Sequence, residues 1–484
     1  MKLSTLLKHF HLPIQGQEIS VKGITCHSNK VQKGDIFVAL KGLHRNGADF
    51  IPDAIKRGAI AILADQKLPK QKVPVIFVED AHLMWAKMAS YLFKTKHLKI
   101  LAITGTNGKT STVYFIEQIL NKLGIPTASI GTIGVKSPVY NASGHLTLPE
   151  PDTLYQTLHI LEKKKVQVVA LEASSQGLDQ ERLSGVQTEA SGFTNLTQDH
   201  LDYHHSFESY LACKMRLFTE RTKTGGTAVL NADISEYPYQ KDLCEQSGLR
   251  VLSYGFQGKD LHLISAENKG DYQEITLQIN RKSFHLKLPV LGDFQVHNML
   301  CALGLCHSLG IDYKKILPLL SQIQAPMGRM ELIGWLPNKA SVYVDYAHTP
   351  DALEHVLTSF RKKNPKNLVA LFGARGNRDQ TKRPIMGEIA NHLADKVYIT
   401  DDDTDTENSA DIRAMILKKC PKGIEIPDRT KAIEKAIKNL TSGEILVIMG
   451  KGHENYRLTT QGIQTYSDIV YVRQLIKKMK GTLV

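Results

Sequence analysis

The stretch "KILAITGTNGKTSTVYFIEQILNKLG", residues 99–124, predicts a strand, a glycine loop and a helix in succession. Its apolar start has the length of a buried strand, and the part from Lys109 onward has the apolar spacing of a helix that ends at Gly124. Glycines let a backbone approach an anion closely, and a helix N-terminus adds partial positive charge. The stretch therefore predicts a phosphate-binding loop after a buried strand.

The loop is shorter than the usual GxxxxGK[ST] pattern, because Ile103 stands where that pattern has its first glycine. Lys109 is expected to neutralise the β- and γ-phosphate oxygens, and Thr110 or Ser111 to hold Mg²⁺ through a hydroxyl. A plain strand–turn–helix junction is the simpler alternative, but glycine, lysine and hydroxyl together favour phosphate binding. The predicted loop set is Gly105, Thr106, Asn107, Gly108, Lys109, Thr110 and Ser111.

Apolar runs and helical segments alternate along most of the chain, which predicts an α/β fold with a doubly wound, mostly parallel central sheet. With 484 residues the chain is too long for one core, and two to four domains are expected. New patterns begin near residue 98 and near "APMGRMELI", residues 325–333. We therefore predict three domains: a smaller N-terminal α/β domain at 1–97, a central P-loop domain at 98–327 and a Rossmann-like domain at 328–484.

Composition and charge exclude several classes of protein. Six scattered cysteines without a CxxC pair argue against a zinc ribbon and a disulfide framework, and favour a reducing cytoplasm. No apolar run is long enough for a membrane span, and the N-terminus is too polar for a secretory signal. The net charge of +13 is compatible with nucleic acid, an anionic membrane, a polyanionic small substrate or mere solubility.

Acidic and imidazole side chains follow two further predicted strands. Glu172 ends the apolar run "VQVVALE", and Asp199, His200, Asp202 and His204 crowd the segment "TNLTQDHLDYHH". Any one of them alone is more simply a helix cap or a surface residue. Because the carboxyl ends of parallel strands meet at one edge of a sheet, their shared position predicts a divalent cation beside the phosphate loop.

Eight motifs in order resemble those of the Mur ligases and match the MurE type best. They are "GTNGKTST", "EASSQGLDQERL", "TNLTQDHLDYH", "GDFQVHN", "MGRMEL", "VDYAHTPDAL", "GARGNRDQTKRP" and "GKGHE". The resemblance spans nearly the whole chain, including "GITCHSNKVQKGDIFVALKG" near its start. It implies that ATP phosphorylates the D-glutamate carboxylate of UDP-N-acetylmuramoyl-L-alanyl-D-glutamate. An amine of a diamino acid then attacks the acyl phosphate and forms an amide.

The resemblance also assigns roles around the nucleotide. Lys109 and Thr110 would cradle the phosphates, and Arg329 would approach them across the hinge between domains. Mg²⁺ would be held by Thr110, Glu172, His200 and a carbamylated Lys214; without the family, Lys214 is better explained as a solvated helix lysine. Lys109, Lys214 and His200 would be catalytic. The residues implied to face adenine and ribose are Asn298, Asp345 and His348.

For the other substrates, the resemblance implies that the N-terminal domain binds UDP, with Ser28 contacting uridine, and that the C-terminal domain binds the amino acid. Glu454 would meet the side-chain amine of the amino acid, and Gly450 its backbone side. Arg182 can pair bidentately with a substrate carboxylate. The further residues implied to contact sugar, peptide or amino acid are Thr147, Leu148, Ser174, Gln180, Arg378, Asp402, Asp403 and Asp405.

The sequence departs from the family pattern in three places. Thr147-Leu148-Pro149 lacks the second threonine of a pair, and Gln176 replaces a histidine that could titrate. Asp402-Asp403-Thr404-Asp405 replaces Asp-Asn-Pro-Arg, whose arginine grips the distal carboxylate of diaminopimelate. An acidic pocket favours an ammonium group, hence L-lysine, unless Arg375 or Arg378 takes over that carboxylate. We expect meso-2,6-diaminopimelate first and L-lysine as a close second.

Two alternatives differ in substrate or in class. A folylpolyglutamate synthase shares the central domain but is disfavoured by the uridine-type start and the GKGHE ending. A P-loop nucleic-acid-binding ATPase would explain the basic excess but is disfavoured by its dispersal, with no aromatic-interleaved basic patch. We therefore expect a cytoplasmic, monomeric ligase that uses ATP and Mg²⁺ and binds small molecules, neither nucleic acid nor membrane.

Overall fold

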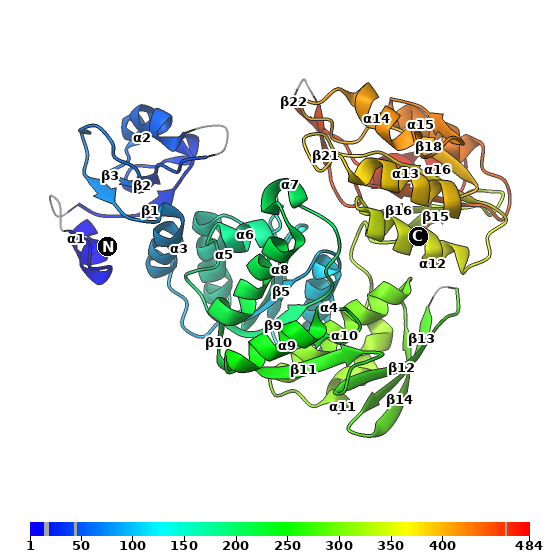
Figure 1. Cartoon of the computed structure of the whole chain (residues 1–484), viewed down its shortest axis with the longest axis horizontal. Helices are drawn as coiled ribbons and strands as arrows, with labels where there is room; N and C mark the ends of the chain where they lie inside the picture. Colours follow the sequence, from blue (N-terminus) through cyan, green and yellow to red (C-terminus); the bar gives the residue numbers. More distant parts are fainter. Residues whose placement is uncertain (14–18, 43–45, 145, 271, 460–461) are drawn as a thin grey trace.

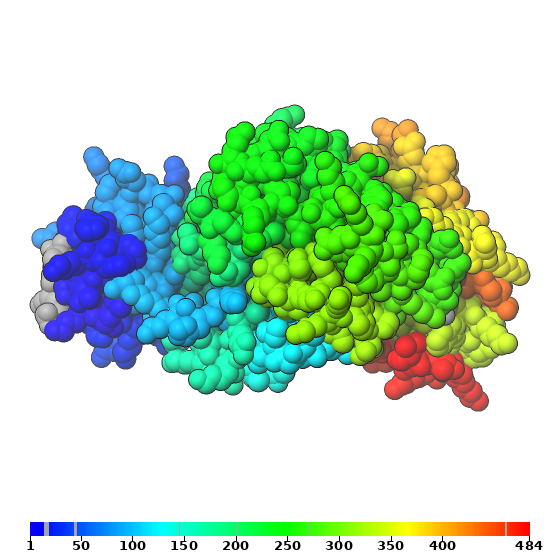
Figure 2. Space-filling model, turned by 90° about the horizontal axis from the view of Figure 1, so that it is seen from below, coloured from blue at the N-terminus to red at the C-terminus, as the bar shows by residue number. Residues whose placement is uncertain are grey.

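Three sheets follow one another along the chain and lie in a row in space (Figures 1 and 2). The computed structural model describes residues 1–13, 19–42, 46–144, 146–270, 272–459 and 462–484. The sheets have four, ten and seven strands, and a two-stranded hairpin accompanies the third. The predicted mixed α/β fold with several domains and a mostly parallel central sheet is confirmed. Among the described residues, no helix combines the length and apolarity that crossing a membrane requires.

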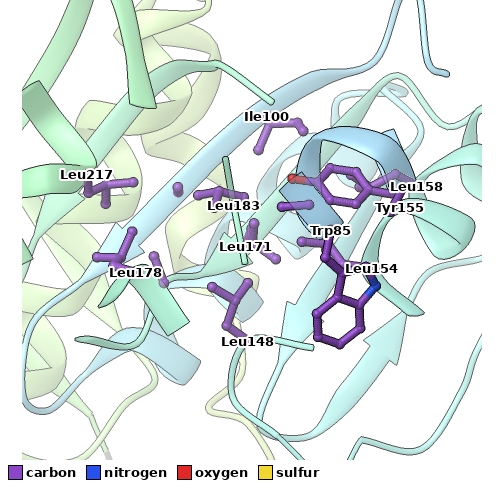
Figure 3. Close-up of a cluster of buried hydrophobic side chains, with 14 of the residues drawn as sticks. Trp85, Ile100, Leu148, Leu154, Tyr155, Leu158, Leu171, Leu178, Leu183 and Leu217 are labelled. Carbon is purple, nitrogen blue, oxygen red and sulfur yellow. The ribbon is translucent and has the colours of Figure 1, made fainter. Parts of the chain in front are cut away.

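The N-terminal sheet is parallel throughout and its strands run in sequence order. Helix α3 leads from it towards the centre, and Trp85 of α3 packs into the same cluster as Ile100, Leu154 and Tyr155 of the central domain (Figure 3). This part contains α1 (Leu3–His9), β1 (Gly23–Thr25), η1 (Ser28–Lys30), β2 (Asp35–Val38), η2 (Gly47–Phe50), α2 (Ile51–Arg57), β3 (Ala61–Ala64), β4 (Val75–Phe77) and α3 (Ala81–Leu92).

The central sheet has the order β14-β13-β12-β11-β10-β9-β5-β8-β6-β7, and β5 lies between β9 and β8. The pairs from β6 to β12 are parallel, whereas β7 at one edge and β13 and β14 at the other pair antiparallel. The strands are β5 (Lys99–Thr104), β6 (Thr127–Gly131), β7 (Gly134–Lys136), β8 (Val168–Glu172), β9 (Thr188–Phe193), β10 (Thr222–Asn231), β11 (Arg250–Gly255), β12 (Leu261–Asn268), β13 (Gln273–Ile279) and β14 (Lys282–Leu288).

Helices cover both faces of this sheet, because side chains of a strand alternate between its faces. In β5, Leu101 and Ile103 join the core formed with α4 and α10, whereas Ile100 and Ala102 join the core formed with α3 and α5. The helical segments of this part are α4 (Lys109–Lys122), α5 (Pro151–Lys163), α6 (Ser175–Asp179), α7 (Leu201–His204), α8 (Phe207–Arg216), η3 (Leu217–Arg221), α9 (Tyr237–Gln246), α10 (Asp293–Ser308), α11 (Tyr313–Ile316) and η4 (Leu317–Gln322).

The antiparallel extension β12–β14 was not predicted from the sequence. Residues 274–279 alternate between buried apolar and less buried polar side chains, as a strand with one covered face does. The turn at Asn280 and Arg281 has both residues at positive φ, which is the backbone of a tight hairpin. The alternation is readable from the sequence, but the predicted strands were placed only at the continuous apolar runs that are typical of parallel sheets.

The C-terminal sheet has the order β19-β18-β17-β20-β16-β15-β23 and is parallel from β19 to β16. Loops after β16, β17, β18 and β20 leave its carboxyl edge, where the predicted motifs stand. Its elements are β15 (Glu331–Trp335), β16 (Ser341–Asp345), α12 (Pro350–Arg361), β17 (Leu368–Phe372), α13 (Lys382–Leu393), β18 (Lys396–Ile399), α14 (Ser409–Leu417), β19 (Gly423–Glu425), α15 (Arg429–Lys438), β20 (Ile445–Met449), β21 (Tyr456–Thr459), β22 (Gly462–Thr465), α16 (Asp468–Lys478) and β23 (Thr482–Leu483).

Candidate active site

The predicted phosphate loop connects β5 to α4 and needs glycine at two positions. Gly105 has φ 137°, and a Cβ built on it would lie 2.0 Å from Thr194 Oγ1. Gly108 has φ 87°, and its Cβ would lie 2.1 Å from Asn298 Oδ1. Both backbones occupy a region that L side chains rarely adopt, and both lack space for a side chain. The loop shape therefore depends on these glycines and on the two residues packed against them.

Two lysines converge on one carbonyl of this loop: Lys109, which is partly buried, and Lys214, which is fully buried. Lys109 Nζ donates to Gly105 O at 2.9 Å and to Thr106 O at 2.8 Å, and Lys214 Nζ, from α8, donates to Gly105 O at 2.9 Å. Neither amine forms an ion pair with a carboxylate of the described chain. Burial lowers the pKa of both lysines, and repulsion by Lys109 lowers that of Lys214 further. The loop thus holds amines from two elements, neither of them in an ion pair with a described carboxylate, which is an arrangement that an anion can complete.

Glu172, at the end of β8, is a carboxylate that contacts this loop. Thr110 Oγ1 donates to its Oε2 at 3.0 Å, and Thr132 N donates to its Oε1 at 2.9 Å. Burial raises the pKa of Glu172, and Lys109 opposes that rise. A hydroxyl and a carboxylate this close are oxygen donors of the kind that a hard divalent cation binds.

His200 follows β9 and faces the same cavity as Glu172. Its Nε2 lies 3.4 Å from Asp199 Oδ2, and its backbone has φ 55°. Burial by itself raises the pKa of Asp199, but His200 and nearby cations lower it to about 2, so this carboxylate stays ionised. Burial lowers the pKa of His200, which favours the neutral imidazole that can bind a metal.

A cavity of about 550 Å³ lies where the central and C-terminal sheets meet. Many of the predicted site residues line it: Thr106, Asn107, Gly108, Lys109, Thr110, Thr147, Glu172, Ser174, Arg182, His200, Arg329, His348, Arg378 and Glu454. The other predicted residues are not among its lining: Ser28, Gly105, Ser111, Leu148, Gln180, Lys214, Asn298, Asp345, Asp402, Asp403, Asp405 and Gly450.

Some of the residues outside the lining hold those that line it. Asn298 packs beneath Gly108. Asp345 accepts hydrogen bonds from Met330 N and Ala347 N, each at 2.6 Å, and so ties the residue before β15 to the loop after β16. His348 Nδ1 donates to Tyr346 O at 2.8 Å, and burial lowers the pKa of His348 to about 4.

Arg182 is held in the same way by two predicted neighbours. Its Nη1 donates to Leu148 O at 2.7 Å and its Nη2 donates to Gln180 Oε1 at 2.6 Å. The Leu148 side chain is fully buried among Leu171, Leu178 and Leu183, so that its backbone carbonyl, rather than its side chain, holds Arg182 (Figure 3). Here the threonine missing from the family pattern is replaced by a core residue.

Two contacts join the C-terminal part to the phosphate loop. Arg329 Nη2 donates to Thr110 Oγ1 at 3.1 Å, and its guanidinium lies 4.5 Å from the centre of the Tyr346 ring. Asn107 Nδ2 donates to Asp351 Oδ2, in the first turn of α12, at 2.8 Å. The loop is thereby connected to the third sheet, although α12 lies far along the chain.

The GKGHE segment forms a buried ionic network with the acidic stretch after β18. Lys451 Nζ donates to Asp403 Oδ1 at 2.7 Å, contacts Glu454 Oε2 at 2.8 Å and lies 3.7 Å from Asp402 Oδ1. Arg375 Nη2 donates to Asp403 Oδ2 at 2.6 Å. Burial alone lowers the pKa of Lys451, but the three carboxylates raise it above its ordinary value.

This network changes the interpretation of the acidic stretch. Asp403 is neutralised by Arg375 and Lys451, and Asp402 borders a separate cavity on the C-terminal sheet. Asp405 is exposed and accepts a hydrogen bond from Asn377 Nδ2 at 3.0 Å. The acidic pocket for an ammonium group, which would favour L-lysine, is therefore not formed by Asp403 and Asp405 in this structure.

Several residues with contacts at the site were not predicted. Thr132 binds Glu172, Asn195 Oδ1 accepts from Asn107 N at 2.8 Å, and Asp351 binds Asn107. Asn195 and Asp351 lie within the family motifs quoted above, so the sequence marks both residues, but it does not show that they contact Asn107. Thr132 has no comparable motif and could be found only from the structure.

A phosphate loop at the carboxyl edge of one parallel sheet, facing a second parallel sheet across a cavity, defines a nucleotide-dependent α/β enzyme. Three family models match the chain: the Mur ligase middle domain at residues 103–306, the Mur ligase glutamate ligase domain at 328–452 and the Mur ligase family catalytic domain at 20–91. The chain belongs to the Mur ligase family.

Relatives and solved structures agree with this assignment. A UDP-N-acetylmuramoyl-L-alanyl-D-glutamate–2,6-diaminopimelate ligase of Caulobacter vibrioides is 41% identical over 467 residues, covering 94% of this chain and 96% of that protein. The ligase of the same name from Rickettsia conorii is 36% identical over 469 residues, covering 95% and 97%. A solved structure of a ligase of this name has a TM-score of 0.70 at 30% identity and covers 100% of both chains.

Two more distant structures share the fold alone. A MurF ligase from Thermotoga maritima in complex with ADP has a TM-score of 0.67 at 19% identity, covering 96% of this chain and 99% of that one. A Mycobacterium tuberculosis folylpolyglutamate synthase complexed with ADP and AMPPCP has a TM-score of 0.63 at 15% identity, covering 76% and 92%. The latter covers less of this chain than the Mur ligases do.

Proposed function

We propose that this protein uses ATP to join meso-2,6-diaminopimelate to the D-glutamate carboxylate of UDP-N-acetylmuramoyl-L-alanyl-D-glutamate, a step of peptidoglycan precursor synthesis. The observation that carries the proposal is the shared cavity, which is lined by the cationic phosphate loop and by Glu454 of GKGHE. Full-length similarity to ligases with this printed name supports the choice of substrates.

The reaction has two steps. A carboxylate oxygen of the D-glutamate attacks the γ-phosphorus of ATP, the bond to ADP breaks, and an acyl phosphate forms. The amine of diaminopimelate then adds to the acyl carbon, and the resulting tetrahedral intermediate expels phosphate and loses a proton. One anion attacks another in the first step, so positive charge held in place by the protein lowers the barrier.

In this scheme Lys109 supplies that charge, with Arg329 approaching from the other side of the cavity. Lys109 Nζ donates to Gly105 O of the loop, and Arg329 Nη2 donates to Thr110 Oγ1. Thr110, Glu172 and His200 are the residues that would hold Mg²⁺, which supplies charge neutralisation of the phosphates when it is bound. The oxygen donors of Thr110 and Glu172 fit such an ion.

Lys214 is proposed to carry a carbamate. Carbamylation requires a neutral amine, whose lone pair attacks CO₂ while a proton leaves. Burial favours the neutral form of Lys214, and the one protein acceptor described for its amine is a carbonyl. The modification would place an anion, in exchange for a neutral amine, beside the proposed metal ligands.

For the amino acid, we propose that Glu454 receives the side-chain ammonium group and Arg378 the distal carboxylate. Glu454 and Arg378 line the same cavity, and Arg378 is exposed. Asp405, which stands where the family has its carboxylate-binding arginine, is turned to Asn377. This arrangement favours diaminopimelate over L-lysine, because a guanidinium remains for the second carboxylate and Asp403 is already neutralised.

We also propose that the domains divide near residues 98 and 328, between the three sheets, and that the protein acts as a cytoplasmic monomer. Size-exclusion chromatography with light scattering tests the monomer, and limited proteolysis tests the two boundaries. A dimer in solution would contradict the first expectation, and persistent cleavage inside β5–β14 would contradict the second.

The function is tested by an amino acid panel. The protein is incubated with ATP, Mg²⁺ and UDP-N-acetylmuramoyl-L-alanyl-D-glutamate, and with diaminopimelate, L-lysine or D-lysine, and products are identified by mass. With ¹⁸O in the glutamyl carboxylate, one labelled oxygen is expected in the released phosphate. Turnover with L-lysine alone would overturn the substrate, unlabelled phosphate would overturn the mechanism, and stimulation by a tetrahydrofolate instead would point to the folate enzymes.

A further inference from the structure

A thiol, an imidazole and a carboxylate meet at the junction of the N-terminal and central parts, away from the cavity described above. They belong to Cys26 and His27, which follow β1, and to Glu150, which precedes α5. One ligand atom of each lies within 4.8 Å of the others. His27 Nε2 is 2.6 Å from Glu150 Oε2, and Cys26 Sγ is 4.0 Å from Glu150 Oε1. In the described part of the chain, no other group of three such donors is this compact.

The three donor types select among metal ions. Sulfur and imidazole nitrogen with one carboxylate oxygen are ligands of Zn²⁺, whereas Mg²⁺ and Ca²⁺ take oxygen ligands. Tetrahedral Zn²⁺ with bonds of about 2.0–2.3 Å places its ligand atoms roughly 3.4–3.8 Å apart. The three ligand atoms therefore have to move by only about 1 Å, through side-chain rotation, to bind one ion. All three residues are only partly buried, so an ion and a water molecule can reach them.

We propose that Cys26, His27 and Glu150 form a Zn²⁺ site with a water molecule as the fourth ligand. The site joins two parts of the chain that are separated by 123 residues between His27 and Glu150. Asp152 lies close enough to act electrostatically on Cys26 and His27 and adds negative potential, with Lys30 as the opposing cation. A divalent cation compensates these carboxylates and the thiolate that binding creates.

The position of the site gives it a consequence for substrate binding. His27 precedes Ser28, the predicted uridine contact, and Glu150 follows Thr147-Leu148-Pro149 of the predicted muropeptide contacts. A bound ion therefore fixes the distance between two segments that would grip opposite ends of one substrate. Zinc binding itself does not depend on the proposed reaction, and it is measured without any substrate.

The experiment measures metal binding and thermal stability of the full chain after treatment with a chelator. Zn²⁺ is titrated against a chromophoric competitor, and Co²⁺ is used as a spectroscopic substitute. We expect one Zn²⁺ per chain, a higher melting temperature with Zn²⁺ and a thiolate-to-cobalt charge-transfer band. Among the six cysteines, all within the described chain, Cys26 alone is not buried, so such a band can be assigned to it.

Variants decide whether these three residues are the ligands. Cys26→Ser is expected to weaken Zn²⁺ binding by at least about 100-fold and to remove the charge-transfer band, and Glu150→Gln to weaken binding in the same direction. Cys420→Ser, at a buried thiol of the C-terminal sheet, is the matched control and should retain both. A variant that merely destabilises the fold lowers the melting temperature but keeps its rise with Zn²⁺. No stoichiometric binding by the parent chain, or equal binding by Cys26→Ser, would overturn the site.

Discussion

The phosphate loop of the central sheet and the GKGHE segment of the C-terminal sheet both place a lysine at the carboxyl edge of parallel strands, the first partly and the second fully buried, but they balance its charge in opposite ways. Lys109 meets two carbonyl oxygens, and burial lowers its pKa. Lys451 lies among the carboxylates of Asp402, Asp403 and Glu454, which raise its pKa despite burial.

The difference separates binding from architecture. A buried cation without a counter-ion costs folding free energy unless an anion arrives, so the loop is complete only with its ligand. A buried cation inside a satisfied network instead determines the shape of its surroundings, and removing it leaves carboxylates unpaired. We therefore expect Lys109→Met to lose activity without losing stability, and Lys451→Met to lose stability.

Lys109→Met should give the largest effect, a fall in kcat/KM for ATP of about 10⁴-fold, because charge that neutralises the transferred phosphoryl group is lost. Its free energy of unfolding should stay unchanged or rise, since no carboxylate loses an ion-pair partner. Steady-state phosphate release and urea unfolding measure the two quantities. Lys122→Met, at the exposed end of the same helix, is the control with near-parental activity. Retention of a tenth of the activity by Lys109→Met would refute the role.

Lys451→Met should lower the free energy of unfolding by about 3 kcal/mol, because three buried carboxylates lose their shared cation. Urea unfolding of Lys451→Met and of Lys109→Met under the same conditions compares the free energies of unfolding of the two variants. Equal stability of the two variants would break the distinction drawn between the loop and the network.

Lys214→Ala should reduce turnover by about 100-fold if its carbamate contributes charge at the metal site. Short carboxylates such as acetate should restore part of the lost activity by occupying the space of the carbamate. Lys214→Arg keeps the positive charge and fills that space, so it should be inactive and insensitive to acetate. Rescue of both variants, or of neither, would argue against carbamylation.

A smaller effect concerns pH. An anion bound at the loop raises the lowered pKa of Lys109, so binding of ADP should take up a fraction of a proton. Affinity should then fall as the pH rises through the pKa of Lys109 in the free protein, which burial holds below its ordinary value, because Lys109 loses its proton there. Calorimetry in buffers of different ionisation enthalpy measures the uptake. Lys109→Met should lose it, whereas Lys451→Met, if folded, should keep it.

The sequence was most informative where local chemistry decides structure. The strand, glycine loop and helix at 99–124 follow from apolar spacing and glycine placement, and the structure has them at the predicted places. Glu172 and His200 could be placed near the loop because parallel strands end at one edge. The roles assigned to these side chains remain predictions, since geometry alone does not measure them.

What the sequence could not provide is pairing over long distances. The contact of Asn107 with Asp351, and that of His27 with Glu150, link residues far apart in the chain and have no local pattern. The same holds for Asp403: its charge could be read from the sequence, but its neutralisation by Arg375 and Lys451 depends on how loops meet. Counting the acidic residues of this stretch therefore overestimates the negative electrostatic potential that a ligand would meet.

The hydrogen bond from Asn107 to Asp351 ties the proposed phosphate loop to the third sheet, so a nucleotide that changes this contact on binding also changes the energy of placing that sheet. Such coupling is reciprocal: if nucleotide binding favours the sheet in its present position, then a ligand that holds the sheet away from the loop lowers the affinity for the nucleotide by the same factor. A compound aimed between the sheets could thus compete with ATP without resembling it.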